Sequence, residues 1–248
     1  MNFILRIISI PFSILAYTLL GFYFVLFHPI QWICLRLFGY EAHKRSVDAL
    51  NFMLLSTMPL LFSWAKVEFR SDIPEGKAII FAANHQSMFD IMTMGWFLRR
   101  YHPKYVSKIE LAKNIPSVSF NLRHGGSAVI DRKNPRQALP ELKKMGEYIN
   151  THKRSVVLYP EGTRSRTGVP GEFAANGLKI LCKYAPDVLV VPVSINNSWK
   201  INRYGTFPLG LGSMIKLTVH EPIAVSEQPF EELFEITKER IISAIEVK

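Results

Sequence analysis

The hydrophobic positions of the chain follow two different patterns, divided near residue 65. Residues 1–65 are apolar throughout, with 42 hydrophobic residues among 65. Within them, residues 7–27 form an uncharged run of 21, and a transmembrane helix needs about 20 such residues. A second uncharged run, 49–65, is shorter and contains Pro59, which is expected to kink or end a helix. This pattern predicts an N-terminal apolar helical membrane segment over residues 1–65.

After residue 66, short apolar or β-branched runs alternate with segments of helical spacing. Such alternation predicts an α/β domain over residues 66–248, with a mainly parallel or mixed sheet flanked by helices. The predicted strands are 77–83, 105–107, 127–130, 155–159, 188–193 and 215–219. The predicted helices are 88–99, 136–150, 174–184 and 231–247.

The apolar segment is compatible with two forms of membrane attachment. Either the first run spans the bilayer and the second lies in the interface, or both form a monotopic hairpin in one leaflet. A helical pair packed on a soluble domain is the alternative to membrane attachment. If the first run spans, Arg36, Lys44 and Arg45 outweigh Arg6, which places the following domain in the cytoplasm.

Composition and charge exclude some classes of protein and indicate an anionic partner. With 48% hydrophobic and 20% charged residues, the chain is neither disordered nor a disulfide scaffold. Its net charge is +10, and residues 123–166 alone hold ten basic and four acidic residues. This excess suits an anionic partner such as a lipid headgroup, a phosphorylated substrate, an acidic carrier protein or nucleic acid. Cys34 and Cys182 lack metal-ligand spacing and are expected to be reduced, as on a cytosolic face.

The first candidate for chemistry is the pair His85 and Asp90, which follows the predicted strand 77–83. At the start of a helix the backbone can turn so that Asp90 reaches back to the imidazole and fixes its tautomer. His43 and Asp48 have the same spacing but lie in a continuous helix, where five residues at about 100° each separate the side chains by roughly 140°. We interpret that second pair as solvated surface residues. A capping His with an unrelated Asp is the structural alternative for His85.

The second and third candidates are a turn that follows one strand and the charged end of another. Pro160-Glu161-Gly162-Thr163-Arg164-Ser165 follows strand 155–159, and Asp131-Arg132 ends strand 127–130. Gly162 permits a tight turn, Arg164 offers a bidentate fork for phosphate, and Thr163 adds a hydroxyl. A polar β-turn without a ligand is the alternative reading. The chain lacks the motifs of serine hydrolases, P-loop or dinucleotide-binding proteins and zinc proteases.

In this order, the motifs resemble the 1-acylglycerol-3-phosphate acyltransferase family, within the glycerolipid acyltransferases. The matching blocks are Asn-His-x4-Asp at 84–90, Gly-x4-Asp-Arg at 126–132, Pro-Glu-Gly-Thr-Arg-Ser at 160–165 and Val-Pro-Val at 191–193. The intervening 108–111 and 115–116 also look like the family. Tyr159 replaces the usual Phe, residues 128–129 are smaller than is common, and 117–120 lack the expected Phe-x-Gly, which leaves the acyl-chain or acceptor preference open.

The resemblance implies a mechanism and a set of site residues. His85 would act as general base on the acceptor hydroxyl and Asp90 would orient it, without a covalent acyl-enzyme, a metal or a bound cofactor. The acyl donor would be acyl-CoA or acyl-carrier protein, and the acceptor a lysophosphatidate-like membrane lipid. A donor near Gly162 or the start of the His85 helix would stabilise the oxyanion. The substrate-binding candidates are Lys108, Arg132, Glu161, Gly162, Thr163, Arg164 and Pro192.

Three alternatives remain open at this point. An acyltransferase with another acceptor, such as a lyso-amino-acid lipid, would use the same guanidinium groups for a carboxylate. A membrane-tethered nucleic-acid-binding protein fits the charge, but no recognition-helix or RNP-type motif occurs, so no nucleic acid is expected. An inactive scaffold of the same family is the third, and the intact His85 and Asp90 argue against it.

Overall fold

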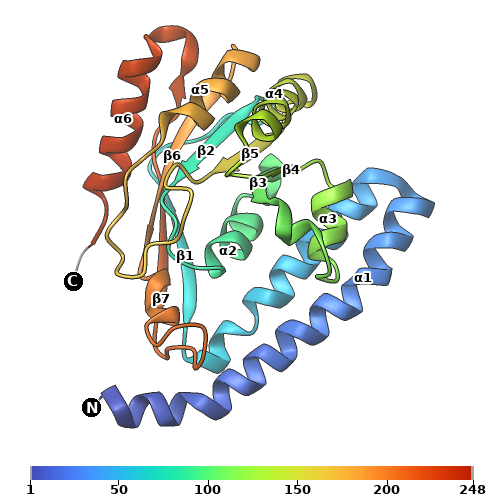
Figure 1. Cartoon of the computed structure of the whole chain (residues 1–248), viewed down its shortest axis with the longest axis vertical. Helices are drawn as coiled ribbons and strands as arrows, with labels where there is room; N and C mark the ends of the chain where they lie inside the picture. The colour runs from blue at the N-terminus through green and yellow to red at the C-terminus, as the bar shows by residue number, and fades with distance from the viewer. Residues whose placement is uncertain (1, 247–248) are drawn as a thin grey trace.

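The computed structural model describes residues 2–246 as one mixed β-sheet with helices on both faces (Figure 1). The strand order is β1-β7-β6-β2-β5-β3-β4, with β8 beside β6. Neighbouring strands are parallel except for β6–β7 and β6–β8. The strands are β1 (Trp64–Phe69), β2 (Ile79–Ala83), β3 (Pro103–Lys108), β4 (Ala128–Ile130), β5 (Ser155–Leu158), β6 (Leu189–Asn196), β7 (Met214–Val219) and β8 (Ile223–Ala224). The predicted mixed α/β fold is confirmed.

The helices divide between the two faces of the sheet. They are α1 (Asn2–Leu55), α2 (Phe89–Phe97), α3 (Val118–His124), α4 (Pro135–His152), α5 (Ala175–Tyr184) and α6 (Phe230–Ser243). In Figure 1, α1, α2 and α3 lie on one side of the sheet, and α4, α5 and α6 lie on the other. Two separate apolar cores follow from this arrangement.

The central strand β2 shows why its sequence is continuously apolar. Its five residues are all buried. Because successive side chains of a strand point to opposite faces, Ile79 and Phe81 enter the core beneath α1 and α2. Ile80 and Ala82 enter the core beneath α4, α5 and α6. A strand covered on both faces has no solvent side, so alternation is lost from its sequence.

The structure differs from the sequence-based elements mainly at the edges of the domain. Strand β1 was not predicted; it begins at Trp64, so two residues of the expected membrane segment belong to the sheet. Its burial alternates between exposed and half-buried, as expected of an edge strand, and its apolar signal is weak. The short helix α3 was also missed. Helix α6 ends at Ser243, earlier than the predicted boundary, and Val247 lies outside the described residues.

Helix α1 is two helices that meet at Gly39. This residue has φ 80° and ψ −169°, outside the helical region. Figure 1 shows that the two halves of α1 run in opposite directions and form a hairpin. Pro59 lies beyond the end of α1, in a 3₁₀ turn at Met58–Leu61. By length and composition, one stretch of the described chain, Phe3–Leu61, is long and apolar enough to cross a membrane.

The first half of α1 is tied to the domain at intervals along its length. The backbone N–H of Leu209 donates to the Ser13 hydroxyl at 2.8 Å, and the Tyr17 hydroxyl donates to the carbonyl of Thr206 at 2.5 Å. Further along, the Ser117 hydroxyl donates to the carbonyl of Phe24 at 2.6 Å. The second half of the hairpin packs against α2, where the rings of Phe52 and Trp96 lie 4.9 Å apart. The helical hairpin is therefore a structural part of the domain.

The hairpin also corrects the interpretation of His43 and Asp48 as solvated residues. His43 is only 1% exposed, and its ring packs edge-on against Phe120 with centroids 5.7 Å apart. Asp48 is half-buried and pairs with Lys44 at 2.5 Å. Both were misplaced because the sequence does not show that the second half of α1 folds back onto the domain. Both cysteines are free thiols; Cys182 is buried and Cys34 is half-buried.

Candidate active site

His85 lies in the loop between β2 and α2, at the edge of the sheet where the parallel strands end. This is the edge at which α/β folds bind ligands. The preceding residue, Asn84, anchors the loop: its amide donates to the carbonyl of Ile195 at 2.9 Å and accepts from the backbone N–H of Ile195 at 2.7 Å. The loop is thus held to the neighbouring strand β6 by two hydrogen bonds from one buried side chain.

The structure brings His85 and Asp90 together. Asp90 is fully buried in the first turn of α2, and its Oδ2 accepts from His85 Nδ1 at 2.8 Å. The same oxygen accepts from the backbone N–H groups of Gln86 at 2.7 Å and Ser87 at 2.9 Å. A carboxylate can only accept, so it holds the proton on Nδ1 and leaves Nε2 free to take one. The break between strand and helix makes this short contact possible.

Glu161 supports the loop instead of facing a ligand. Its Oε1 accepts from the backbone N–H of His85 at 2.7 Å, and its Oε2 accepts from that of Gly171 at 2.7 Å. Burial raises the pKa of Glu161, and the two backbone hydrogen bonds act in the opposite direction. Both carboxylate oxygens of Glu161 are bound within the protein. We therefore revise its predicted substrate contact and interpret Glu161 as a residue that positions the His85 loop.

Further contacts fix the His85 ring and the turn beside it. The buried ring of Tyr159 stacks on the imidazole, with centroids 4.1 Å apart and planes 17° apart. The backbone N–H of Ser165 donates to the carbonyl of His85 at 2.8 Å. Gly162 has φ 64°, a left-handed conformation suited to glycine, and its N–H donates to the carbonyl of Tyr159 at 3.0 Å. That N–H is therefore occupied and is not the oxyanion donor considered above.

Three predicted basic residues gather at the same edge. Lys108 ends β3 and pairs in register with Ile130 of β4, and Arg132 follows two residues later. Part of the Arg132 side chain packs against the protein, and this partial burial lowers its pKa; Glu110 opposes this effect, and the nearby charge of Arg164 adds to it. All three basic side chains are exposed, as is Thr163 beside Arg164. The arrangement gathers three cationic side chains at the edge that carries His85, and such side chains bind phosphate and carboxylate groups.

Pro192 is not at this edge. It lies buried inside β6, where it pairs in register with Ala82 of β2. Its partner Ala82 precedes His85 by three residues, so Pro192 lies inside the sheet as a packing residue. We therefore revise its predicted substrate contact.

An apolar cavity of about 310 Å³ opens beside the site. Met88, next to the His85 loop, and Arg164 line one part of it. Most of the remaining wall comes from both halves of α1, from α2, from β3, from the 3₁₀ turn at Ile109–Ala112 and from α3. It includes Phe24, Leu50, Leu54, Ile91, Met92, Leu111 and Leu122. Such a shape suits a long hydrocarbon chain.

Sequence reasoning missed several of these residues. No local signal marks Tyr159 as the residue that stacks on His85, or Gly171 as the partner of Glu161, because the contacts join distant segments. The cavity wall from α1 was foreseen only as a general role of the apolar segment. Residues 2–246 contain no group of three or more His, Cys, Asp or Glu side chains placed to hold a metal ion.

Comparison with known proteins places this geometry in context. A family model described as Acyltransferase matches residues 65–196, more than half of the chain. A chloroplastic 1-acyl-sn-glycerol-3-phosphate acyltransferase of Brassica napus, BAT2, is 30% identical over 144 residues, which are 58% of this chain and 40% of the relative. The 1-acyl-sn-glycerol-3-phosphate acyltransferase of Helicobacter pylori J99 is 32% identical over 135 residues, 51% of this chain and 54% of the relative.

A solved structure shares the fold. The crystal structure of the 1-acyl-sn-glycerophosphate acyltransferase PlsC from Thermotoga maritima aligns with a TM-score of 0.76 at 24% identity, over 99% of this chain and 96% of that one. The chain spans only about half of the length of the curated relatives, 40% and 54% in the two cases above. With the family model covering the site and most of the sheet, the chain belongs to the acyltransferase family.

Proposed function

We propose that the chain transfers an acyl group from an acyl thioester to the free hydroxyl of 1-acylglycerol-3-phosphate, giving phosphatidic acid. The observation that carries this proposal is the buried His85–Asp90 pair, whose free Nε2 lies at an edge lined by basic residues and beside an apolar cavity. The names of the related proteins, which are 1-acyl-sn-glycerol-3-phosphate acyltransferases, support it.

In the proposed reaction His85 moves one proton. Nε2 takes the proton of the acceptor hydroxyl as that oxygen attacks the thioester carbonyl carbon. The new C–O bond forms a tetrahedral intermediate, which then expels the thiolate as the C–S bond breaks, and the imidazolium returns the proton to the sulfur. The carboxylate of Asp90 stabilises the imidazolium between these steps. The reaction balances without a covalent acyl-enzyme.

The intermediate needs a hydrogen-bond donor for its oxyanion. At the start of α2, the N–H groups of Gln86 and Ser87 are bound to Asp90, and that of Phe89 is bound to the Ser87 hydroxyl. The N–H of Met88 has no partner within residues 2–246, and Met88 lines the cavity. We therefore assign the Met88 N–H to the oxyanion.

The basic residues at the site and the proposed reaction indicate which substrates the enzyme uses. Arg132 and Arg164, with Lys108 and Thr163 nearby, would hold the acceptor phosphate. The donor would be acyl-CoA or acyl-carrier protein, used as a substrate. The proposed reaction transfers no electrons and uses no activated group other than the acyl thioester. We therefore propose that the enzyme uses no bound cofactor.

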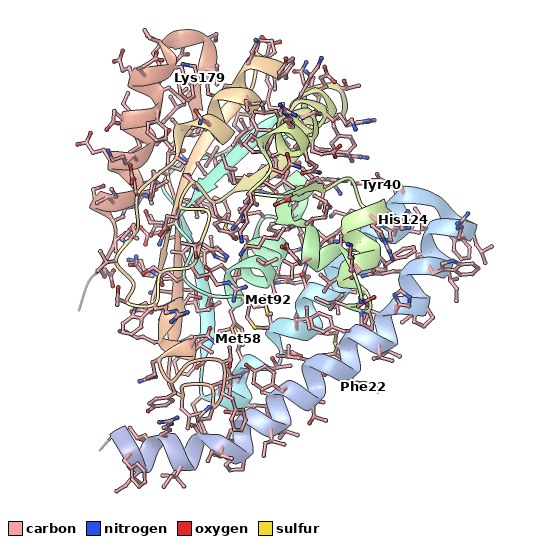
Figure 2. All side chains as sticks on the ribbon, viewed as in Figure 1. Phe22, Tyr40, Met58, Met92, His124 and Lys179 are labelled. Atoms are coloured by element: carbon pink, nitrogen blue, oxygen red, sulfur yellow. The ribbon has the colours of Figure 1, made fainter. Side chains whose placement is uncertain are left out.

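We further propose monotopic attachment to the membrane, with the domain on the cytoplasmic side. A helix that spans a bilayer has lipid around it, but the first half of α1 is bound to the domain at Ser13, Tyr17 and Phe24. Its outward side is apolar: Phe3, Phe22 and Val25 are 74%, 55% and 62% exposed. Figure 2 shows Phe22 on the side of α1 that faces away from the sheet. The cytoplasmic side is where acyl-CoA and acyl-carrier protein are available.

The deciding experiment is a panel of acceptors with radiolabelled acyl-CoA. Wild-type protein in vesicles should acylate lysophosphatidate in preference to a neutral monoacylglycerol, to other lysophospholipids and to a lyso-amino-acid lipid. His85→Ala should abolish transfer while the protein still folds and binds vesicles. Arg164→Ala should reduce the preference for the phosphate-bearing acceptor, and Arg123→Ala, at the exposed end of α3, should not. Faster transfer to another acceptor would replace the proposed substrate.

A further inference from the structure

The apolar cavity contains a polar cluster that the proposed reaction does not use. Three of its lining residues, Gln31, His43 and Lys104, are polar and yet only 0%, 1% and 7% exposed. Gln31 and His43 come from opposite halves of the α1 hairpin, and Lys104 comes from β3. We name these three residues the polar cluster.

The polar cluster has unused hydrogen-bonding capacity. Within residues 2–246, both amide atoms of Gln31 and Nε2 of His43 are buried without a partner. Lys104 Nζ lies 4.9 Å from the centre of the Tyr40 ring, and the described chain offers it no hydrogen bond or ion pair. A buried polar group without a partner costs stability. The Gln31 amide and the His43 ring, which line one cavity together with Lys104, therefore indicate a ligand that pairs with them.

The polar cluster lies well below the catalytic edge. Lys104 pairs in register with Val156 of β5, which pairs with Ile80 of β2. Ile80 precedes the end of β2 by three residues, which is about 10 Å along the strand. Since Met88 and Arg164 line the same cavity at the catalytic edge, a chain whose thioester lies at His85 would extend toward the polar cluster.

The chemistry of the polar cluster favours a hydroxyl group. Burial, with smaller effects of Lys104 and His124, lowers the pKa of His43 to about 4, so the ring is neutral near pH 7. A neutral imidazole and an amide each offer a donor and an acceptor, and a hydroxyl also does both. A carboxylate only accepts, which would leave the Gln31 carbonyl oxygen without a donor. It would also face Asp48, which lines the same cavity.

We propose that Gln31, His43 and Lys104 bind a hydroxyl group carried along the acyl chain of the donor, so that the enzyme selects hydroxylated acyl chains. This inference rests on the proposed function, because it assigns the cavity to the acyl chain that is transferred. It names a specificity for that substrate and leaves the His85 chemistry unchanged.

A competition experiment tests the proposal with the full-length protein in vesicles. Lysophosphatidate is offered an equal mixture of palmitoyl-CoA and one hydroxypalmitoyl-CoA isomer, and the product ratio is read by mass spectrometry. The isomers place the hydroxyl at successive positions along the chain. One position in the distal part of the chain should be preferred over the plain chain about tenfold, because it satisfies the polar cluster.

Variants link the preference to these residues. Gln31→Leu and Lys104→Met should each bring the ratio for the preferred isomer close to one. Lys113→Met, which changes an exposed lysine that does not line the cavity, should keep the wild-type ratio. A ratio near one for every isomer in the wild type would overturn the proposal and indicate a polar cluster satisfied by water alone. The same competition is run with ω-carboxypalmitoyl-CoA in place of the hydroxylated donor. Selection of that chain would also overturn the proposal.

Two further experiments distinguish a failure of this inference from a failure of the proposed function. If selection appears only when the hydroxyl is on the chain of lysophosphatidate, the cavity holds the acceptor and the assignment to the donor is wrong. If the protein acylates no lyso-lipid, the proposed function fails, and displacement of a fluorescent fatty acid then tests the polar cluster without turnover. Free hydroxypalmitate should displace the probe about tenfold better than palmitate, and equal displacement would overturn the inference.

Discussion

At the scale of the residue, one oxygen atom organises the proposed catalytic centre. Oδ2 of Asp90 accepts from the imidazole and from two backbone N–H groups, while Oδ1 is buried without a partner among the described residues. The carboxylate thus fixes the loop, the ring and the tautomer together. In the proposed reaction, its negative charge also stabilises the imidazolium that forms when His85 takes the proton.

Asp90→Asn tests this electrostatic role. The amide oxygen can keep the three hydrogen bonds, but the charge is lost and an NH₂ group enters the buried, unpartnered position of Oδ1. We expect kcat to fall 10²- to 10⁴-fold, with little change in KM. Steady-state kinetics with lysophosphatidate measures both. Asp187→Asn, in an exposed turn, is the control, and an Asp90→Asn enzyme with near-normal kcat would contradict the mechanism.

The stability of the Lys104→Met variant relative to the wild type should depend on pH. Burial, reinforced by Arg154 and Lys44 and opposed by Asp48 and Glu41, lowers the pKa of Lys104 from 10.5 to about 7. Between pH 7 and 10.5 the unfolded chain therefore binds more protons at this residue than the folded protein, so the wild type gains stability as the pH rises. Methionine removes the cost of the buried charge, roughly 2–4 kcal/mol below pH 7. Its advantage should shrink toward pH 10.5.

Thermal or denaturant unfolding of both proteins from pH 6 to 10 measures that advantage. Lys113→Met, at an exposed site, should show no comparable dependence on pH. A difference between Lys104→Met and the wild type that stays constant over the whole range would mean that Lys104 titrates normally in the folded protein.

At the scale of the element, the reversal of α1 depends on a backbone conformation that only glycine adopts easily. Gly39 has φ 80° and ψ −169°, and a Cβ there would meet nothing within 4 Å. Steric space is therefore not the constraint. The same helix contains Gly21, which is also surrounded by open space but has helical geometry.

These two glycines form a matched pair of variants. Gly39→Ala should destabilise the protein by about 1–3 kcal/mol, because alanine is strained in this region of φ and ψ. Gly21→Ala should stabilise it by up to about 1 kcal/mol, since alanine favours the helix. Denaturant unfolding compares the two, and equal effects of the same sign would refute the role assigned to Gly39.

At the scale of the whole molecule, the apolar outward side of α1 is the proposed membrane surface. It carries few charges: between residues 3 and 38 only Arg6 and Arg36 are charged. The same helix is bound to the domain at Ser13, Tyr17 and Phe24, so the proposed membrane surface is held in place relative to the edge that carries His85. In the proposed attachment, the cavity between α1 and the sheet lies close to the lipid.

Val25→Asp probes this surface. Val25 is 62% exposed on the first half of α1, and a carboxylate there would have to enter the apolar part of the leaflet. We expect binding to lipid vesicles, measured by co-sedimentation, to weaken about tenfold or more. Leu139→Asp, at a 49% exposed position on α4, should bind like the wild type. Unchanged binding of the Val25 variant would place the membrane contact elsewhere.

The sequence by itself determined the α/β class, most strands and helices, and the pairing of His85 with Asp90. These features depend on local periodicity and on a five-residue spacing across a strand end, which neighbouring residues encode. The order of the motifs also indicated an acyltransferase, and the family model confirms membership of the acyltransferase family. Edge strand β1 and the short α3 were missed because weakly buried or short elements leave little periodic signal.

Only the tertiary structure decided how distant segments combine. It showed that Glu161 supports His85, that Pro192 pairs with Ala82 of β2 inside the sheet, and that His43 is buried against Phe120. It also closed the cavity between the α1 hairpin, α2 and β3, with Gln31 and Lys104 facing one space. The physical reason is that burial and hydrogen-bond partners depend on chain reversals far along the sequence, such as the one at Gly39, and local patterns do not specify which surfaces those reversals bring into contact.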